Sequence, residues 1–177
     1  FAPEPSLGDD IYQDIQRICF EAGRQLERHP ALYRGKNEEA LRDHFLVFLA
    51  PNFEFAGGET FNKSGKTDIL VRHGGGNVFV AECKVWRGRR AYLRAIDQLL
   101  GYTTWRDTKA AVLLFVKSQS VAAVLEEVEA ATPTHVTWVK TMPKADEGWF
   151  RYSFHLPGDP GRELKLAVLV FHFPPTK

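Results

Sequence analysis

Two carboxylates and an amine come close together in the segment 66–86, provided that this segment folds as a β-hairpin. Asp68 precedes the glycine-rich stretch "HGGGN", while Glu82 and Lys84 follow it in "VAECK". A hairpin that turns symmetrically about Gly75 places Asp68 opposite Glu82. Because side chains alternate along a strand, Lys84 then points to the same face as Glu82. The spacing therefore predicts three charged side chains on one face of a sheet.

Such a cluster is costly unless something neutralises it, because adjacent like charges repel and partly buried charges lose hydration. A divalent cation supplies the compensation, and ligands that are all oxygens favour a hard ion such as Mg²⁺ or Mn²⁺. The main-chain carbonyl of Cys83 is a further candidate ligand. Lys84 would stand beside the ion, where an ammonium group can help to orient or deprotonate water, or can stabilise charge that develops on phosphorus. The alternative is an ion-pair network in which Lys84 only neutralises Glu82 or Asp68.

The elements that must position these residues follow from apolar periodicity and from turn residues. Helices are predicted at 9–28, at 37–50 with Asn37 as the N-cap, at 89–105, and at 120–131 from Ser120 onward. Strands are predicted within the hairpin and at 110–116, 135–140, 149–154 and 163–173. This order predicts an α/β fold, with a central mixed β-sheet flanked by helices. The pattern leaves open whether the strands between 135 and 173 extend that sheet or form an interface.

The motifs "TDIL", "VFVAECK" and "QLLGY" resemble, in this order, those of the PD-(D/E)xK nuclease superfamily. The resemblance covers roughly residues 37–117. It implies a restriction-endonuclease-like core with extra C-terminal strands, in a single nuclease-like domain that spans residues 1–177. It also implies that Asp68 and Glu82 bind the metal ion and that Lys84 assists hydrolysis.

The resemblance extends to two helices. The Gln-x-x-x-Tyr pattern of one branch of the superfamily maps to Gln98 and Tyr102, which share a helix face and would help to orient the metal site and the nucleic acid. An acidic residue on an early helix usually completes the site, and Glu38 and Glu39 both qualify. Glu38 shares the inward apolar stripe with Leu41 and is preferred, although both acids also suit the first turn of a helix, where they favour its dipole.

Aromatic and basic side chains gather around the helix that follows the hairpin, and such a rim would suit a phosphodiester backbone. The rim consists of Trp86, Arg87, Arg89, Arg90, Arg94 and Trp105. Arg89, Arg90 and Arg94, together with Tyr102, are the candidates for nucleic-acid contact. An ordinary solvated helix face with two packing tryptophans is the alternative.

The resemblance thus implies a Mg²⁺- or Mn²⁺-dependent nuclease that hydrolyses DNA or RNA, with DNA favoured, in a setting such as bacterial restriction or anti-phage defence. The alternative is a nuclease-like module that binds nucleic acid or a partner without cutting.

Composition adds further expectations. The net charge of +1 does not indicate an overall electrostatic attraction to nucleic acid. The two cysteines favour a reducing, cytoplasmic setting, and the longest apolar runs are too short to span a bilayer. Because the chain starts at Phe1, we expect a piece of a longer protein with a further domain. Cutting both strands of a duplex with one site per chain would favour a homodimer.

Overall fold

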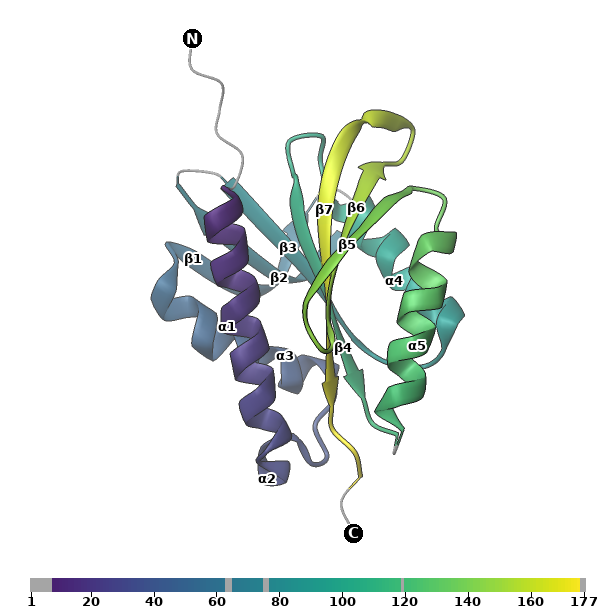
Figure 1. Ribbon diagram of the computed structural model, residues 1–177. Coiled ribbons are helices and arrows are strands. Elements are labelled where there is room, and N and C mark those ends of the chain that lie inside the picture. Colours follow the sequence, from purple (N-terminus) through teal and green to yellow (C-terminus); the bar gives the residue numbers. More distant parts are fainter. Residues whose placement is uncertain (1–7, 63–64, 75–76, 119, 176–177) are drawn as a thin grey trace.

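A computed structural model describes residues 8–62, 65–74, 77–118 and 120–175 of the 177-residue chain. A seven-stranded mixed sheet lies at its centre, with the strand order β1-β2-β3-β4-β7-β6-β5 (Figure 1). The strands are β1 (Phe55–Asn62), β2 (Gly65–His73), β3 (Asn77–Val85), β4 (Lys109–Val116), β5 (Trp138–Asp146), β6 (Trp149–Leu156) and β7 (Asp159–His172). The helices are α1 (Asp9–Glu27), α2 (Pro30–Tyr33), α3 (Glu38–Leu49), α4 (Arg89–Tyr102) and α5 (Val121–Ala131), with 3-10 turns η1 (Ala50–Asn52) and η2 (Thr132–Thr134). None of the described helices is long and apolar enough to cross a membrane.

The sheet combines antiparallel and parallel pairing. Strands β1, β2 and β3 form an antiparallel meander, β4 runs parallel to β3, and β7 runs parallel to β4. Strands β6 and β5 then continue antiparallel to β7 and to each other. The three C-terminal strands therefore extend the central sheet, which decides the question that the sequence left open. The predicted fold class, α/β with a mixed sheet flanked by helices, is confirmed.

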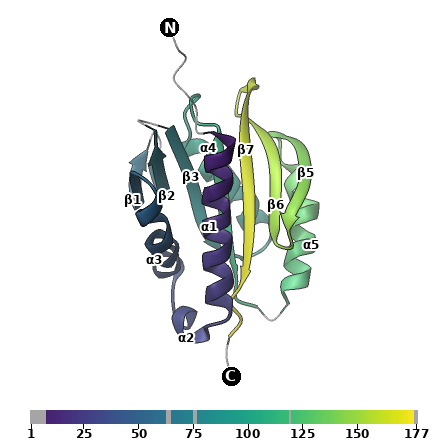
Figure 2. The same cartoon turned by 60° about the vertical axis from the view of Figure 1, so that its left-hand side comes forward.

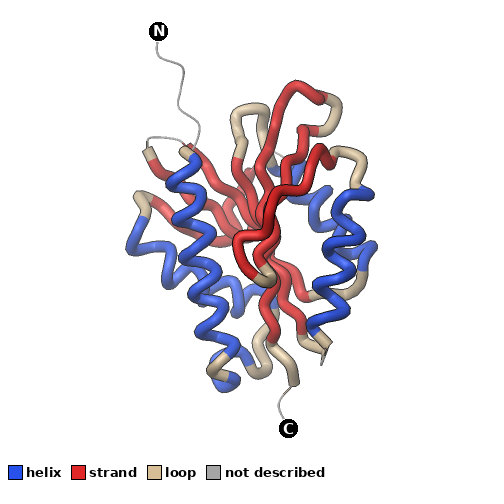
Figure 3. Tube along the Cα trace, viewed as in Figure 1, coloured by secondary structure: helices blue, strands red, loops and turns tan. Residues whose placement is uncertain are grey.

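Helices cover both faces of the sheet (Figures 2 and 3). Strand β4 lies in the middle and is buried along its whole length. Leu113 and Phe115 point into the core that includes α1 and α3, whereas Val112 and Leu114 point into the core under α4 and α5. Side chains alternate along a strand, so a strand that is covered on both faces must be apolar at every position. This accounts for the unbroken run "AAVLLFV".

Two helices begin at the caps that the sequence predicted. The side chain of Asn37 accepts a hydrogen bond from the Ala40 N–H (2.9 Å), and the side chain of Ser120 accepts one from the Ala123 N–H (3.5 Å). These bonds satisfy N–H groups that the first turn of a helix leaves without a partner. Strand β5 begins at Trp138 rather than at residue 135, because His135 closes the preceding 3-10 turn.

The sequence reasoning missed strand β1, "FAGGETFN". Two adjacent glycines and no clear apolar alternation hide this strand, because glycine has low strand propensity. In the structure β1 is an edge strand that pairs with β2. A Cβ atom on Gly58 would lie 2.9 Å from Nε of Arg42. Because glycine has no side chain, this position leaves room for the Arg42 side chain of α3.

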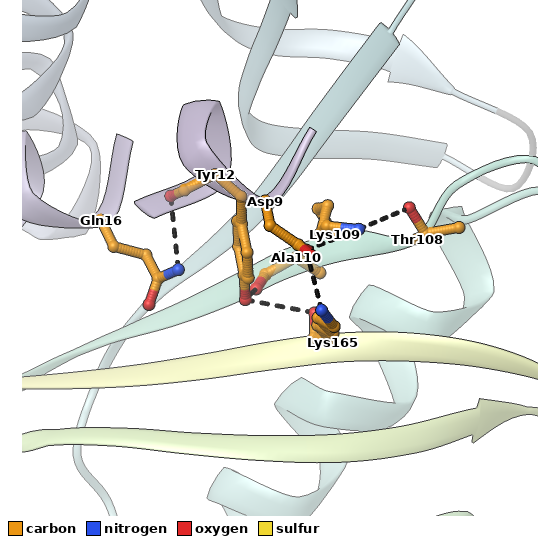
Figure 4. A network of polar contacts seen from close by, with 7 residues as sticks. All are labelled: Asp9, Tyr12, Gln16, Thr108, Lys109, Ala110 and Lys165. Carbon is orange, nitrogen blue, oxygen red and sulfur yellow. Dashed lines mark hydrogen bonds and ion pairs between the residues drawn. The ribbon is translucent and has the colours of Figure 1, made fainter. Parts of the chain in front are cut away.

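A polar network fixes the first turn of α1 on the starts of β4 and β7 (Figure 4). The Asp9 carboxylate accepts a hydrogen bond from Lys165 Nζ (2.7 Å) and lies 3.5 Å from Nζ of Lys109. The hydroxyl of Tyr12 donates to the carbonyl of Ala110 (2.8 Å). Burial lowers the pKa of Lys109, and the charge of Asp9 opposes this shift. Asp9 thus offsets part of the cost of burying an ammonium group.

Candidate active site

The structure bears out the register that the sequence predicted for the hairpin β2–β3. The pairs run from His73–Asn77 to Ile69–Ala81, as expected for a turn centred on Gly75, itself outside the described residues. Asp68 and Glu82 follow immediately beyond the last of these pairs. The hairpin therefore brings both carboxylates to the same level of the sheet, on two neighbouring strands.

Asp68 contacts the main chain of β3 at this level. Its Oδ2 accepts a hydrogen bond from the N–H of Cys83 (2.8 Å). The N–H and the carbonyl of one residue in an extended strand point to the same side, so the carbonyl of Cys83 points toward Asp68. The side chain of Cys83 itself is buried in the opposite core, as expected from alternation.

Glu82 is the most strongly perturbed carboxyl group of the site. It is 5% exposed, and burial, with the charge of Asp68 as the second cause, raises its pKa from 4.5 to about 8. Nζ of Lys84 lies 3.9 Å from its Oε1 and opposes the shift. Its other oxygen, Oε2, is buried and has no hydrogen-bond partner among the described residues. A buried carboxylate oxygen without a partner is costly, so this atom calls for a cation or a proton.

The pKa of Asp68 is raised as well. Burial is the main cause; the bond from Cys83 and the positive charge of Arg42 lower it, while Glu38 raises it. The charge of Asp68 in turn raises the cost of ionising Glu82. Without a cation, Glu82, whose pKa is raised to about 8, favours its protonated form near neutral pH.

Glu38 lies close enough to act on both carboxylates, since its charge raises the pKa of Asp68 and of Glu82. Its Oε1 lies 3.4 Å from Nη1 of Arg87, on the segment between β3 and α4. Glu39 is exposed. Within the described ranges, no group of three His, Cys, Asp or Glu side chains could hold a metal ion. The structure thus brings Asp68 and Glu82 together and leaves Glu38 beside them, paired with Arg87.

Helix α4 lies over the same face of the sheet. Gln98 and Arg94, one turn apart, line a pocket of about 240 Å³ together with Lys84 and Arg87. Tyr102 is one turn further along. Its pKa is raised by burial first and then by the charges of Glu82 and Asp68, so its hydroxyl lies near the carboxylates. The pattern Gln-x-x-x-Tyr therefore faces the site.

Only some of the arginines of the basic rim lie beside the site. Arg94 and Arg87 line the pocket beside Lys84. Arg89 instead pairs with Glu127 of α5, with 3.7 Å between Nε and Oε2, and Arg90 is exposed. The two tryptophans also differ: Trp86 packs against Tyr92, with ring centroids 5.7 Å apart, whereas Trp105 is exposed.

The sequence reasoning missed Arg42. This residue is buried on α3, one turn after Glu38 and between the core residues Leu41 and Phe45, and its charge lowers the pKa of Asp68. It also pairs with Asp43 (2.9 Å). The spacing of four from Glu38 puts both on one helix face, which is the signal that could have found it.

The donor set fits a divalent cation. Asp68 and Glu82 offer carboxylate oxygens, one of which has no other partner within the described part of the chain, and the carbonyl of Cys83 points to the same side. Mg²⁺ commonly takes only one or two protein carboxylates and leaves its other positions to water and phosphate. A pair of carboxylates therefore suffices for such a site, and Glu38 lies beside the pair.

Comparison of the chain with protein-family models, with curated proteins and with solved structures finds no match. The function proposed below is therefore inferred from the fold and from the geometry of this site.

Proposed function

We propose that the chain is a Mg²⁺- or Mn²⁺-dependent nuclease of the PD-(D/E)xK type, which hydrolyses phosphodiester bonds of DNA or RNA. The observation that carries the proposal is the convergence of Asp68 and Glu82 beside Lys84, with the pKa of both carboxyl groups raised. A buried pair of like charges is unfavourable unless a cation completes it. An adjacent ammonium group can serve to stabilise a phosphoryl group that gains charge during hydrolysis.

The cation would be held by Asp68, Glu82 and the main-chain carbonyl of Cys83. Glu38 would bind the cation directly or through water, and its ion pair with Arg87 would then break. When bound, the cation supplies Lewis-acid polarisation of the phosphoryl group and makes water a stronger acid.

The side chains around the pair bind and orient the substrate. Lys84, whose Nζ lies 3.9 Å from Oε1 of Glu82, presents its remaining N–H bonds to phosphoryl oxygens. Arg87 and Arg94 flank Lys84 in the pocket and neutralise further phosphates. Gln98, in the same pocket, and Tyr102 are placed to hold the nucleotide at the site.

The resemblance supports bacterial restriction or anti-phage defence as the setting, in the cytoplasm and with DNA as the preferred substrate. One site per chain supports a homodimer if both strands of a duplex are cut.

A second candidate is a module that binds nucleic acid or a partner without cutting it. The ion pair between Glu38 and Arg87 favours this alternative, because it occupies the carboxylate that usually completes such sites.

The test is a cleavage assay of single- and double-stranded DNA and RNA with Mg²⁺ or Mn²⁺. We expect cleavage of at least one substrate, and a loss of about 100-fold or more in rate for Lys84→Ala, the range found when one charge-stabilising donor is removed. Lys140→Ala, which removes an exposed lysine from the edge strand β5, is the matched control and should cleave normally. A wild-type chain that binds substrate and cation but cuts nothing would favour the second candidate, and equal cleavage by Lys84→Ala would contradict both the role of Lys84 and the proposed site.

A further inference from the structure

A second group of basic and aromatic side chains lies beyond the end of α4. Trp105 is 52% exposed, and two guanidinium groups lie over its ring: Cζ of Arg106 is 4.0 Å from the ring centroid and Cζ of Arg162 is 4.9 Å away. Arg162 comes from strand β7, far from Trp105 in the sequence. We call Trp105, Arg106 and Arg162 the tryptophan cluster. Tryptophan is enriched at interfaces, where its ring supplies a large contact area.

A turn of residues 104–107 presents the cluster to solvent. The N–H of Asp107 donates to the carbonyl of Thr104 (3.0 Å), and the carboxylate of Asp107 accepts from the N–H of Thr104 (2.7 Å). The N–H of Arg106 donates to the hydroxyl of Thr104 (3.3 Å). These bonds place Trp105 and Arg106 at the two central positions of the turn, where side chains project outward.

The main chain joins the segment directly after this turn to the middle of β7. The N–H of Lys165 donates to the carbonyl of Thr108 (2.8 Å), and Lys109 pairs with Lys165 in the parallel register of β4 and β7. Arg162 therefore reaches Trp105 from a neighbouring strand. Among the residues that the structure describes, no carboxylate lies within ion-pair distance of Arg162.

Three carboxylates of this region are already engaged. Asp107 closes the turn, Asp9 bridges Lys109 and Lys165, and Asp159 accepts a bond from the N–H of Gly161 (3.2 Å). The guanidinium group of Arg162 can therefore bind an anion of a ligand. A guanidinium group that stacks on an indole ring is restrained in orientation while it keeps donors for phosphate oxygens.

The cluster is close in the sequence to the site residues of α4. Arg94, Gln98 and Tyr102 follow one another at intervals of four, α4 ends at Tyr102, and Trp105 comes three residues later on the turn. Three residues span at most about 11 Å, so Trp105 lies within this distance of Tyr102. A strand that passes Tyr102 can therefore reach the cluster.

We propose that Trp105, Arg106 and Arg162 form a binding site for an unpaired, single-stranded segment of nucleic acid, next to the end of α4 that carries Tyr102. Bases stack on the indole and guanidinium planes, which accept any base, and Arg162 binds the backbone phosphate. The inference rests on the proposed function, since the site at Asp68 and Glu82 is what identifies the ligand as a nucleic acid. It adds a substrate class, because bases within a duplex cannot stack on the cluster.

The experiment measures binding without cutting. A fluorescein-labelled single strand of about 12 deoxythymidines, its RNA counterpart and a duplex of the same length are titrated with the chain in EDTA. We expect either single strand to bind more tightly than the duplex. Trp105→Ala should raise the Kd for the single strand about 5- to 150-fold, and Trp105→Tyr should retain most of the affinity. Arg162→Gln should reduce the slope of log K against log salt by about 0.7, the value for one phosphate contact.

Arg24→Gln is the matched control. Arg24 also stacks on an aromatic ring, with its Cζ 5.6 Å from the centroid of Phe20, but lies on α1. The inference is overturned if the wild-type chain does not bind single strands, if Trp105→Ala and Arg162→Gln bind as the wild type does, or if Arg24→Gln loses as much. If the chain cleaves nucleic acid but Trp105→Ala binds single strands as tightly as the wild type, the tryptophan cluster is not a binding site and the proposed nuclease function is unaffected. If binding depends on Trp105 but the chain cleaves no substrate, the cluster is supported and the nuclease function is refuted.

Discussion

Removing the charge of Glu82 should make the cation-free protein more stable at alkaline pH. Burial and the charge of Asp68 raise the pKa of Glu82 from 4.5 to about 8. Between these values the folded chain holds a proton that the unfolded chain has released, so the free energy of unfolding falls as pH rises through this range. One unit of pKa is equivalent to about 1.4 kcal/mol, so the full shift sets a ceiling of about 5 kcal/mol. Relaxation and water penetration reduce such penalties, and we expect roughly 2–4 kcal/mol.

The assay is urea unfolding in EDTA from about pH 5 to about pH 9, with Glu82→Gln compared with the wild type at each pH. The variant should gain stability relative to the wild type as pH rises, and the gain should level off above pH 8. Contributions of groups that behave alike in both proteins cancel in the difference. Glu39→Gln changes an exposed acid of α3 and should show no such trend. A difference between Glu82→Gln and the wild type that stays constant with pH would refute the electrostatic account of the pair.

Two further predictions concern the fold. Gly23→Ala should destabilise the chain by about 1–3 kcal/mol in urea unfolding, because the new Cβ would lie 2.1 Å from Cε1 of the buried Phe171. Gly101→Ala, at a helical position with nothing within 4 Å, should be neutral or stabilising, and equal losses for both would contradict this packing argument. Asp9→Asn should cost about 0.5–1 kcal/mol, because it weakens the counter-ion of the buried Lys109, while solvent screens the exposed carboxylate. The loss should shrink in high salt, and a loss that salt does not change would exclude this cause.

The register of the hairpin β2–β3 could be predicted because its information is local. Apolar runs lie on both sides of a short glycine-rich turn, and a symmetric turn centred on Gly75 fixes which residues pair. The same local signals located the caps at Asn37 and Ser120. Once this register is known, it follows that the charged side chains of Asp68 and Glu82 lie close together.

The surroundings of the pair could not be predicted in the same way. The spacing of four from Glu38 places Arg42 on the same helix face, but it does not indicate that this charged side chain is buried or that it acts on Asp68, because that effect crosses from α3 to β2. The ion pair of Glu38 with Arg87 likewise joins segments far apart in the chain. Strand β1 was missed because Gly57 and Gly58 weaken its pattern, although pairing with β2 stabilises it. Tertiary contacts, rather than local propensity, decide these three features.

Calorimetric titration of Mn²⁺ into the metal-free chain measures whether Asp68 and Glu82 hold a divalent cation. We expect a saturable site that Asp68→Asn weakens by at least tenfold and that Glu39→Gln leaves intact. Near neutral pH the measured heat should also depend on the buffer, because a cation that binds the ionised Glu82, whose pKa is raised to about 8, displaces its proton. Absence of saturable binding in the wild type, or equal binding by Asp68→Asn, would contradict the claim that this carboxylate pair is a divalent-cation site.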